Sequence, residues 1–363
     1  MINYIHEPTD LQCGQAVLAM VLGKSAEDMA DLLRNERETT LKEMKDTFAL
    51  FGVSVSSQRR EATSKADLPD LCMLSLETPR CWHWSLYAGG VFYDPEHGVM
   101  DDFPECKRKY FWQLTKPRHR LTDTALEDAL MHDDKPSEYL SLNRERYPQL
   151  AALTGIPQPA QHHMEGDAFT HTLMVADEAA KRRDAVRFPL GFMLAAVCHD
   201  MGKAVTTVTE NGAVHALGHE TEGLPIAAEF LRSAGADGHI CRYVLNMTEL
   251  HMEPNIMAGA GSRLKKTNRL FDRAEVPYDL IQLAVCDGLG KIPPVSYEGF
   301  LLERYDMFRE IMSRPFVTVS DLKNAGIRQE KLADAAGYAH KLRLAGIDRE
   351  NALIQTLSQK GFK

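Results

Sequence analysis

Near residue 123 the spacing of apolar residues changes from a mixture of helical and strand patterns to mainly helical patterns. Before that point, residues 13–23 (CGQAVLAMVLG) predict a helix, and residues 24–35 predict a second one. Residues 81–87 and 91–95 are typical of strands, and Gly89-Gly90 between them predicts a two-residue hairpin turn. Beyond residue 123, helical patterns dominate to the end of the chain. The pattern therefore predicts an N-terminal α+β domain followed by helical domains.

Two of the helical runs carry ligand-type side chains at one end. Residues 188–200 predict an apolar helix that finishes with His199 and Asp200, and Gly202 is expected to close it. His171 stands near the start of a helix predicted over residues 169–180. Apolar helices do not usually finish by directing two such side chains at the core, which makes these positions candidates for a site.

Two further helices end their apolar stripes in a histidine or an aspartate. His251 completes one stripe and Asp287 completes another, so both side chains are predicted to point inward. The apolar members are Ile240, Val244 and Met247 in the first stripe and Leu280 and Leu283 in the second. A single inward histidine is most often a core residue, but several together favour a divalent cation, because unpaired buried carboxylates are costly.

Composition narrows the classes of protein. The 363 residues carry a net charge of −9 with 44% hydrophobic and 26% charged residues, which argues against a general nucleic-acid or membrane coat. No signal peptide and no apolar run of roughly 20 residues is recognisable, so a cytoplasmic location and no membrane partner are expected. The seven cysteines are scattered without a CxxC pair, which favours reduced thiols over disulfides or a cysteine-ligated zinc site.

The ligand-type residues stand in ordered blocks that resemble a known family. The blocks are LTGIPQPAQHHMEGDAFTHTLMVAD (153–177), LAAVCHDMGKA (194–204), GHETEG (218–223), TELH (248–251), CDGLGK (286–291) and the tail from Phe316. They resemble the HD-domain metal-dependent phosphohydrolases, and most closely the C-terminal HD domain and tail of bacterial CCA-adding tRNA nucleotidyltransferases. The resemblance covers about residues 137–355.

The resemblance implies roles for the site residues. It implies an all-α HD domain in which His171, His199, Asp200 and Asp287 bind a divalent metal (Mn, Ni, Co, Fe or Mg). The residues that it implies around the metal are His219 and His251, as second-metal ligands or phosphate contacts, Lys203, as a phosphate contact, and His163, which precedes an EGD run. A bound metal lowers the pKa of its water and neutralises phosphate oxygens, which suits hydrolysis of phosphomonoesters and 2′,3′-cyclic phosphates.

The nucleotidyltransferase head of CCA-adding enzymes has no recognisable counterpart. That head needs a Gly-Ser pair and paired carboxylates, and Asp101-Asp102 stands without the glycine element. Nucleotide addition by this chain is therefore not expected.

The N-terminal region carries a second set of reactive residues. Cys13 begins an apolar helix, where the helix N-terminus favours a thiolate. A two-residue turn pairs residue 88 with 91 and 85 with 94, which brings Asp94 to the side of the hairpin that carries His83. The order Cys13, His83, Asp94 resembles papain-like peptidases that cut bacteriocin leaders. That family has a glutamine for the oxyanion where this chain has Glu7, with Gln12 next to Cys13, so a binding module is the alternative.

Three basic stretches are candidates for RNA contact. They are residues 105–121, with Lys107, Arg108, Lys109, Lys116, Arg118 and Arg120 around Tyr110, Phe111 and Trp112; the group Arg263, Lys265, Lys266, Arg269 and Arg273; and the tail from Phe316, with eight Lys/Arg against five Asp/Glu. A charge run is also often only a solvated face. We expect three domains, at residues 1–115, 123–315 and 316–363.

The first functional hypothesis is a metal-dependent phosphohydrolase, acting as a 2′,3′-cyclic phosphodiesterase and phosphatase on RNA or tRNA ends. The alternatives are a small-nucleotide phosphatase or phosphodiesterase with the same site, an RNA- or protein-binding module with a structural metal, and a cysteine peptidase. A protein partner for the N-terminal domain is also open.

Overall fold

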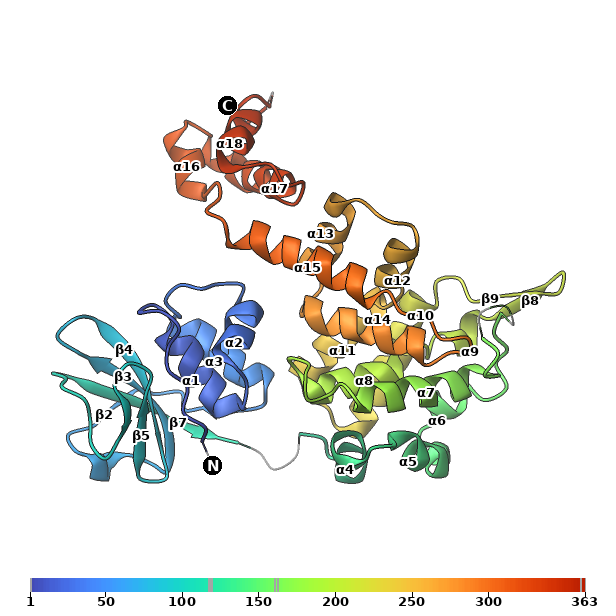
Figure 1. The fold of residues 1–363 in the computed structure, drawn as a ribbon, viewed down its shortest axis with the longest axis horizontal. Coiled ribbons are helices and arrows are strands. Elements are labelled where there is room, and N and C mark those ends of the chain that lie inside the picture. Colours follow the sequence, from blue (N-terminus) through green and yellow to red (C-terminus); the bar gives the residue numbers. More distant parts are fainter. Residues whose placement is uncertain (1, 117–119, 160, 162, 360, 363) are drawn as a thin grey trace. The chain divides into compact units, whose positions relative to one another are not determined.

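The computed structural model describes residues 2–116, 120–159, 161, 163–359 and 361–362. The chain divides into two compact units, Met1–Thr124 with Gly235–Ile240 and Ala125–Ala234 with Cys241–Lys363 (Figure 1). The finer domain limits expected from the sequence, including a separate tail from residue 316, stay predictions. None of the described helices is long and apolar enough to cross a membrane.

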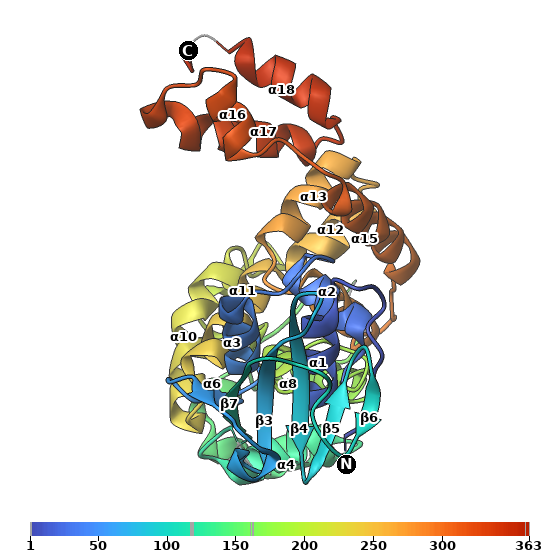
Figure 2. The same ribbon diagram turned by 90° about the vertical axis from the view of Figure 1, so that its left-hand side faces the viewer.

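The first unit is an antiparallel sheet with helices packed on it. The helices are α1 (Cys13–Leu22), α2 (Ala26–Leu33) and α3 (Leu41–Leu50), and the strands are β1 (Ser54–Val55), β2 (Arg60–Glu61), β3 (Leu71–Glu77), β4 (Trp82–Ala88), β5 (Val91–Asp94), β6 (Gly98–Met100) and β7 (Lys109–Thr115). The strand order is β1-β7-β3-β4-β5-β6, with β2 also paired to β7. Figure 2 shows β7, β3, β4, β5 and β6 side by side. Val17, Met44 and Phe48 from the helices pack against Met73 and Leu86 from the sheet.

The hairpin expected at Gly89-Gly90 is present. Strands β4 and β5 pair Ala88 with Val91, and both glycines have positive φ angles (56° and 89°), as a tight hairpin turn requires. This register brings Asp94 and His83 together, as predicted.

The expectation of an aromatic and basic boundary over residues 105–121 is partly wrong. Residues 109–115 form strand β7 inside the sheet, where Phe111 and Trp112 are buried. These rings fill the core and are not free to stack on RNA bases. The amino group of Lys116 bonds to the carbonyl oxygen of Val21, and Arg118 lies outside the described residues.

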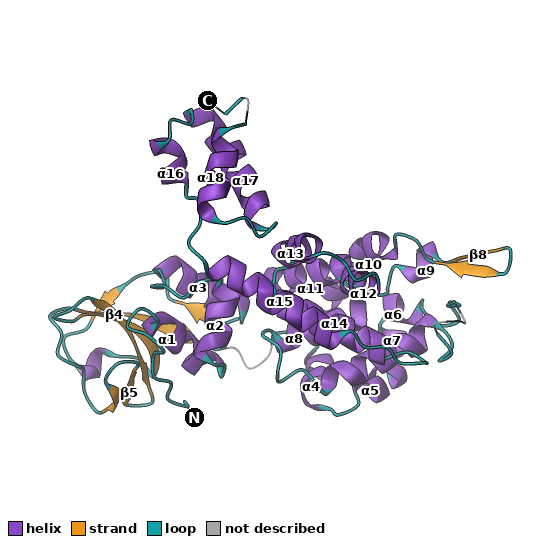
Figure 3. Ribbon diagram, turned by 45° about the horizontal axis from the view of Figure 1, so that its top comes forward, coloured by secondary structure: helices purple, strands orange, loops and turns teal. Residues whose placement is uncertain are grey.

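The second unit is largely helical (Figure 3). Its elements are α4 (Thr124–His132), α5 (Pro136–Leu142), α6 (Pro148–Ala151), α7 (Ala168–Ala180), α8 (Pro189–Cys198), α9 (Lys203–Thr206), β8 (Val208–Glu210), β9 (Ala213–His215), α10 (His219–Ala234), α11 (Gly238–Leu250), α12 (Met252–Gly259), α13 (Leu264–Arg273), α14 (Pro277–Leu289), α15 (Glu298–Ser313), α16 (Val319–Asn324), α17 (Leu332–Arg343) and α18 (Arg349–Leu357). Helix α8 is buried along its length from Leu190 to Cys198 and packs against α7 and α14, as an all-round apolar helix should.

Two details of this unit differ from the sequence-based expectation. The region is not wholly helical, because β8 and β9 form a hairpin around Asn211-Gly212, a turn pair that favours the positive φ angles seen there. Gly202 does not close helix α8, which ends at Cys198, and its φ of −66° is an ordinary helical angle. Its role is steric: a Cβ on Gly202 would lie 2.0 Å from the carbonyl oxygen of His219.

Candidate metal centre

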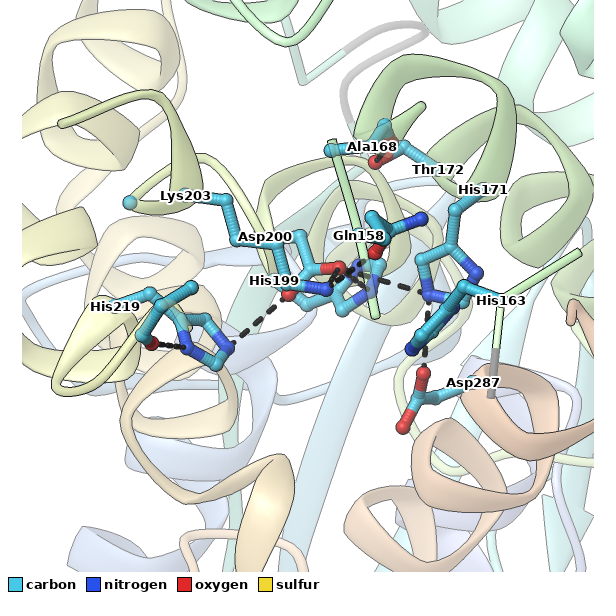
Figure 4. Close-up of polar contacts among 12 residues, drawn as sticks. Gln158, His163, Ala168, His171, Thr172, His199, Asp200, Lys203, His219 and Asp287 are labelled. Carbon is cyan, nitrogen blue, oxygen red and sulfur yellow. Dashed lines mark hydrogen bonds and ion pairs between the residues drawn. The ribbon is translucent and has the colours of Figure 1, made fainter. Parts of the chain in front are cut away.

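Asp200 lies at the centre of four histidines in the helical unit. Its Oδ2 atom is 3.2 Å from Nε2 of His199 and 3.6 Å from Nε2 of His171. Its Oδ1 atom is 3.2 Å from Nε2 of His219 and 3.7 Å from Nε2 of His251. Figure 4 shows His171, His199 and His219 turned towards the Asp200 carboxylate. Each carboxylate oxygen therefore faces its own pair of imidazoles.

Main-chain carbonyl groups orient all four histidines. In each ring Nδ1 faces a backbone oxygen: His199 with Ala196 (2.9 Å), His219 with Ala216 (2.7 Å), His251 with Thr248 (2.7 Å) and His171 with Gly290 (3.1 Å). A carbonyl oxygen only accepts hydrogen bonds, so Nδ1 carries a proton in each ring, and Nε2 is the ring nitrogen that faces Asp200. A histidine held in this way is ready to ligate a metal.

The Nε2 atoms face other acceptors at short range. Nε2 of His219 lies 3.3 Å from Nε2 of His251, and Nε2 of His199 is buried without a hydrogen-bond partner among the described residues. Two lone pairs at this distance repel each other unless a proton or a cation lies between them. Among the groups of described residues that could hold a metal ion, two share Asp200: His171, His199 and Asp200, and Asp200, His219 and His251. The donor set of imidazoles and carboxylates fits a first-row divalent metal.

Asp287 joins the centre from helix α14. Its Oδ1 lies 3.1 Å from Nε2 of His171, and Nδ2 of Asn255 donates to its other oxygen at 3.3 Å. The predicted inward orientation of His251 and Asp287 is confirmed, since they are 0% and 9% exposed. The structure thus brings the four predicted metal ligands together with His219 and His251.

Sequence reasoning missed Glu165, although it lies in the HHMEGD run. Its Oε1 is 2.6 Å from Nδ1 of His163 and 3.2 Å from Nδ1 of His171, and the backbone N–H of Ile292 donates to its Oε2. Burial opposes ionisation of Glu165, but these hydrogen bonds outweigh it and hold its pKa at about 2. His163 therefore adjoins the centre through Glu165, which supports the outer side of the His171 ring.

Lys203 places a positive charge beside Asp200. Its amino group lies 2.7 Å from Oδ2 of Asp200 and donates at 2.7 Å to Oε1 of Gln158, a buried residue that the sequence analysis did not single out. Burial opposes ionisation of Asp200, but the charges of His199 and Lys203 hold its pKa well below the usual range. Asp200 is thus an anion in a buried site, as a metal ligand must be.

The carboxylates also act on the histidines. Burial disfavours the charged form of His171, yet its bonds to Asp287 and Glu165 raise its pKa to about 9. For His251, burial dominates and lowers the pKa. The negative charge that attracts a proton to His171 favours any other cation at the same place.

Two glycines bring His219 to the centre. Gly202 follows the Asp200 turn and Gly223 lies on helix α10, and a Cβ on Gly202 would be 2.7 Å from the backbone nitrogen of Gly223. Only residues without a side chain allow the turn and the helix to approach this closely. This contact places His219, at the start of α10, beside Asp200.

A second cluster of reactive groups lies in the first unit. Nε2 of His83 is 3.0 Å from Oδ1 of Asp94, and the backbone N–H of Trp84 points at Sγ of Cys13 at 3.5 Å. Burial disfavours the charged form of His83, but its bonds to Asp94 and to Cys13 raise its pKa to about 10. The structure therefore brings together the predicted Cys13, His83 and Asp94, although the papain-like assignment of this unit is not confirmed.

Glu7 belongs to the same cluster. Donor atoms of Glu7, Cys13 and His83 all lie within 4.8 Å of one another, and all three residues are buried. Gln12 is the residue before helix α1, and its side chain accepts a bond from Thr9 rather than capping the helix.

The three basic stretches differ in exposure. On helix α13 and just before it, Arg263, Lys265, Lys266, Arg269 and Arg273 are all exposed. Arg273 pairs with Glu253 at 2.7 Å. In the C-terminal segment, helices α16 to α18 have a small core around Leu322, Leu332 and Ala335. The α13 group is therefore an exposed basic surface in the unit that holds the metal centre, and Lys323, Arg328 and Lys341 of the tail are exposed as well.

The helical fold and its central cluster of histidines and carboxylates define a domain of the HD class. Residues 168–290 match the HD domain family. This range contains Asp200 and the five histidines and carboxylates that the geometry brings to it, so the chain carries an HD domain.

The chain is also homologous to proteins named "Multifunctional CCA protein". It is 41% identical over 203 residues to the protein from Pasteurella multocida, covering 52% of this chain and 45% of the relative. It is 27% identical over 214 residues to the one from Alkalilimnicola ehrlichii (56% and 48%), and 32% identical over 131 residues to the one from Actinobacillus pleuropneumoniae (34% and 31%). The matches span less than half the length of these relatives.

Proposed function

We propose that this protein is a metal-dependent phosphohydrolase that acts on RNA ends, with tRNA 3′ ends as the favoured substrate class. The observation that carries the proposal is the division of Asp200 between two pairs of histidines, one pair at each carboxylate oxygen. A carboxylate shared in this way can bridge two divalent ions, an arrangement that many phosphoester hydrolases use. The resemblance of the HD domain and tail to those of CCA-adding tRNA nucleotidyltransferases, together with the homology to proteins named "Multifunctional CCA protein", supports the link to tRNA.

His171, His199, Asp200 and Asp287 would hold one metal, and Asp200 with His219 and His251 a second. Bound metal supplies a hydroxide-like water and neutralises phosphate oxygens. The four carbonyl groups that fix the histidine rings keep Nε2 directed inward throughout. Lys203, at the rim of the same carboxylate, would contact a phosphate oxygen of the substrate. A 2′,3′-cyclic phosphate or a 3′-phosphomonoester fits this chemistry.

The exposed basic group on α13 supports a polynucleotide over a free nucleotide. Four cations without an acidic neighbour in the sequence, Arg263, Lys265, Lys266 and Arg269, lie on this surface. Such a group contributes to RNA affinity mainly through phosphate contacts, which depend on salt. A small-nucleotide phosphatase would not need it.

For the first unit, we favour the hypothesis of a papain-like module that binds a partner. A cysteine peptidase is the alternative, supported by the contact of His83 with Asp94. Against it, Glu7 stands where the papain-like family has the glutamine for the oxyanion, and its donor atom lies within 4.8 Å of those of Cys13 and His83. An anion there opposes the reaction.

The test is a panel of phosphoesters with each divalent metal in turn. We expect the full chain to open 2′,3′-cyclic nucleotides and to release phosphate from 3′-phosphorylated RNA, with Asp200→Ala inactive and Asp306→Ala, an exposed aspartate on α15, fully active. Cleavage of nucleoside triphosphates alone would refute the RNA-end proposal and favour the small-nucleotide one. If the metal-loaded protein hydrolyses none of the esters, the remaining hypothesis is a binding module with a structural metal.

The basic surface gives a second test. The double variant K265E/K266E should raise KM for an RNA substrate with little change in kcat, and leave hydrolysis of a cyclic mononucleotide unchanged. Equal KM values for RNA in the variant and the wild type would contradict RNA contact at this surface.

A further inference from the structure

The cluster in the first unit contains three different kinds of metal donor. A thiol (Cys13), an imidazole (His83) and a carboxylate (Glu7) have their donor atoms within 4.8 Å of one another in a buried place. None of them belongs to the HD domain, so the cluster needs an explanation apart from the proposed phosphohydrolase.

The orientation of His83 suits a metal ligand. Its Nε2 atom is engaged with Oδ1 of Asp94 at 3.0 Å, which leaves Nδ1 for the thiol side. Asp94 is itself fixed, because the backbone N–H groups of Glu96 and His97 donate to the same oxygen at 3.1 and 3.0 Å. A carboxylate behind a histidine in this way orients the ring and makes its other nitrogen a stronger ligand.

Cys13 is placed to ligate as a thiolate. It stands at the first position of helix α1, and the backbone N–H of Trp84 points at its sulfur at 3.5 Å. Both features place the sulfur beside backbone N–H groups, and a metal binds a cysteine through its deprotonated sulfur.

One carboxylate oxygen of Glu7 is buried and unpaired within the part of the chain that the structure describes. The residue is 7% exposed, and its Oε2 has no hydrogen-bond partner among the described residues. Its backbone N–H donates to the carbonyl oxygen of Pro95 at 3.1 Å, which holds the N-terminal segment against the end of strand β5. A buried carboxylate oxygen without a partner is costly, and a cation would remove that cost.

We propose that Cys13 Sγ, His83 Nδ1 and Glu7 Oε2 form a zinc site in the N-terminal unit. Three donors of these types leave one tetrahedral position open, and a thiolate among them selects zinc over magnesium or manganese. The lack of a CxxC pair excludes a multi-cysteine site but not a mixed site with one cysteine. Zinc on Sγ would also occupy the lone pair that a peptidase nucleophile needs.

The test uses cobalt as a spectroscopic stand-in for zinc in the full chain. Only a thiolate ligand gives a sulfur-to-cobalt charge-transfer band in the near ultraviolet, and the HD centre offers nitrogen and oxygen donors alone. We expect the band in the wild type when enough Co²⁺ is added to fill the HD centre as well, and also in Asp200→Ala, and its loss when Zn²⁺ is added. Cys13→Ser should abolish it, whereas Cys81→Ser, at an exposed free cysteine, should not.

Milder variants keep the test decisive if Cys13→Ser folds poorly. Asp94→Asn, which alters the partner behind His83, should weaken cobalt binding by about 10- to 100-fold, and Glu7→Gln, which replaces a ligand, should weaken it at least as much. Both should leave the circular dichroism spectrum unchanged. Absence of the band from the wild type, or a band that survives Cys13→Ser, overturns the proposal. So does rapid alkylation of Cys13 by iodoacetamide that an equivalent of zinc does not slow, the result expected of a free nucleophile.

Discussion

The two clusters of buried histidine and carboxylate are built in opposite ways. In the helical unit one carboxylate, Asp200, is central, and the histidines around it are each held by a carbonyl group of the main chain. In the N-terminal unit one histidine, His83, is central, and the side chain of Asp94 holds it.

The difference predicts how each cluster responds to substitution. Loss of one histidine from the HD centre leaves the others in place, because no histidine depends on another for its orientation. Loss of Asp94 removes the carboxylate that orients the His83 ring. The contacts of His83 with Cys13 and with Glu7 should then both be disturbed. In the HD centre the sensitive position is Asp200, which contacts all four rings.

The largest effect should come from replacing the shared carboxylate. Asp200→Ala should lower hydrolysis by more than about a hundredfold, because loss of a mere outer-shell partner already costs about 10- to 100-fold. Elemental analysis of protein purified without chelator should find near-stoichiometric metal in the wild type and little at the HD centre of the variant. Asp94→Ala should leave the hydrolysis unchanged. An equal loss of activity in both variants would show that the two clusters are not independent.

The next effect concerns the cation beside the HD carboxylate. Lys203→Met should destabilise the metal-free protein by about 3 kcal/mol, because it leaves a buried charge without its partner. Added divalent metal should recover most of this loss, since it replaces the missing charge. Urea unfolding with and without metal measures both values. A loss that metal does not reduce would mean that Lys203 acts through packing rather than charge.

A smaller effect should separate the two halves of the HD centre. Gly202→Ala forces a Cβ against the carbonyl oxygen of His219 and should cost roughly 1–3 kcal/mol. His219 would move away from Asp200, so metal content should fall by about half while the His171 and His199 pair keeps its ion. Gly299→Ala, on helix α15 with nothing near its Cβ, is the matched control and should not destabilise. Unchanged metal content in Gly202→Ala would contradict the division of the centre into two pairs.

The smallest effect is expected at the N-termini of helix α7, which carries His171, and helix α1, which carries Cys13. Asp167 accepts a bond from the N–H of Thr170 at the start of α7, whereas Gln12 makes no capping bond at the start of α1. Asp167→Ala should therefore cost about 1 kcal/mol, and Gln12→Ala should cost little through the helix start.

The cost of Asp167→Ala should depend on pH. Burial opposes ionisation of Asp167, but its bonds from Gly155 and Thr170 outweigh burial and lower its pKa below the ordinary 3.8. A depressed folded-state pKa stabilises the protein above pH 3.8, and this contribution disappears as the pH falls through the lower value. Unfolding measured between pH 7 and acid should show the difference between wild type and variant shrinking on the acid side. If the difference in the free energy of unfolding stays constant with pH, the cost of Asp167→Ala does not come from the charge of the carboxylate.

The sequence predicted the direction of a site side chain where that residue lies in a periodic apolar pattern, and failed where it does not. His251 and Asp287 stand at the ends of regular apolar stripes, so their inward direction followed from helix geometry alone. Glu165 and Gln158 lie in irregular segments, where no period says which way a side chain points. The same limit explains the error at Phe111 and Trp112, since a short strand flanked by basic residues looks like an exposed linker until its neighbours β2, β3 and β1 are known.

Three of the four histidines bond to the carbonyl group three residues before them, at Ala196, Ala216 and Thr248. Each is therefore a self-contained unit, oriented by its own turn of backbone rather than by a distant partner. Such a unit can be gained or lost in one substitution without disturbing its neighbours. Over evolutionary time, a centre built in this way can move between one metal and two, and so between chemistries, by single steps on an unchanged helical frame.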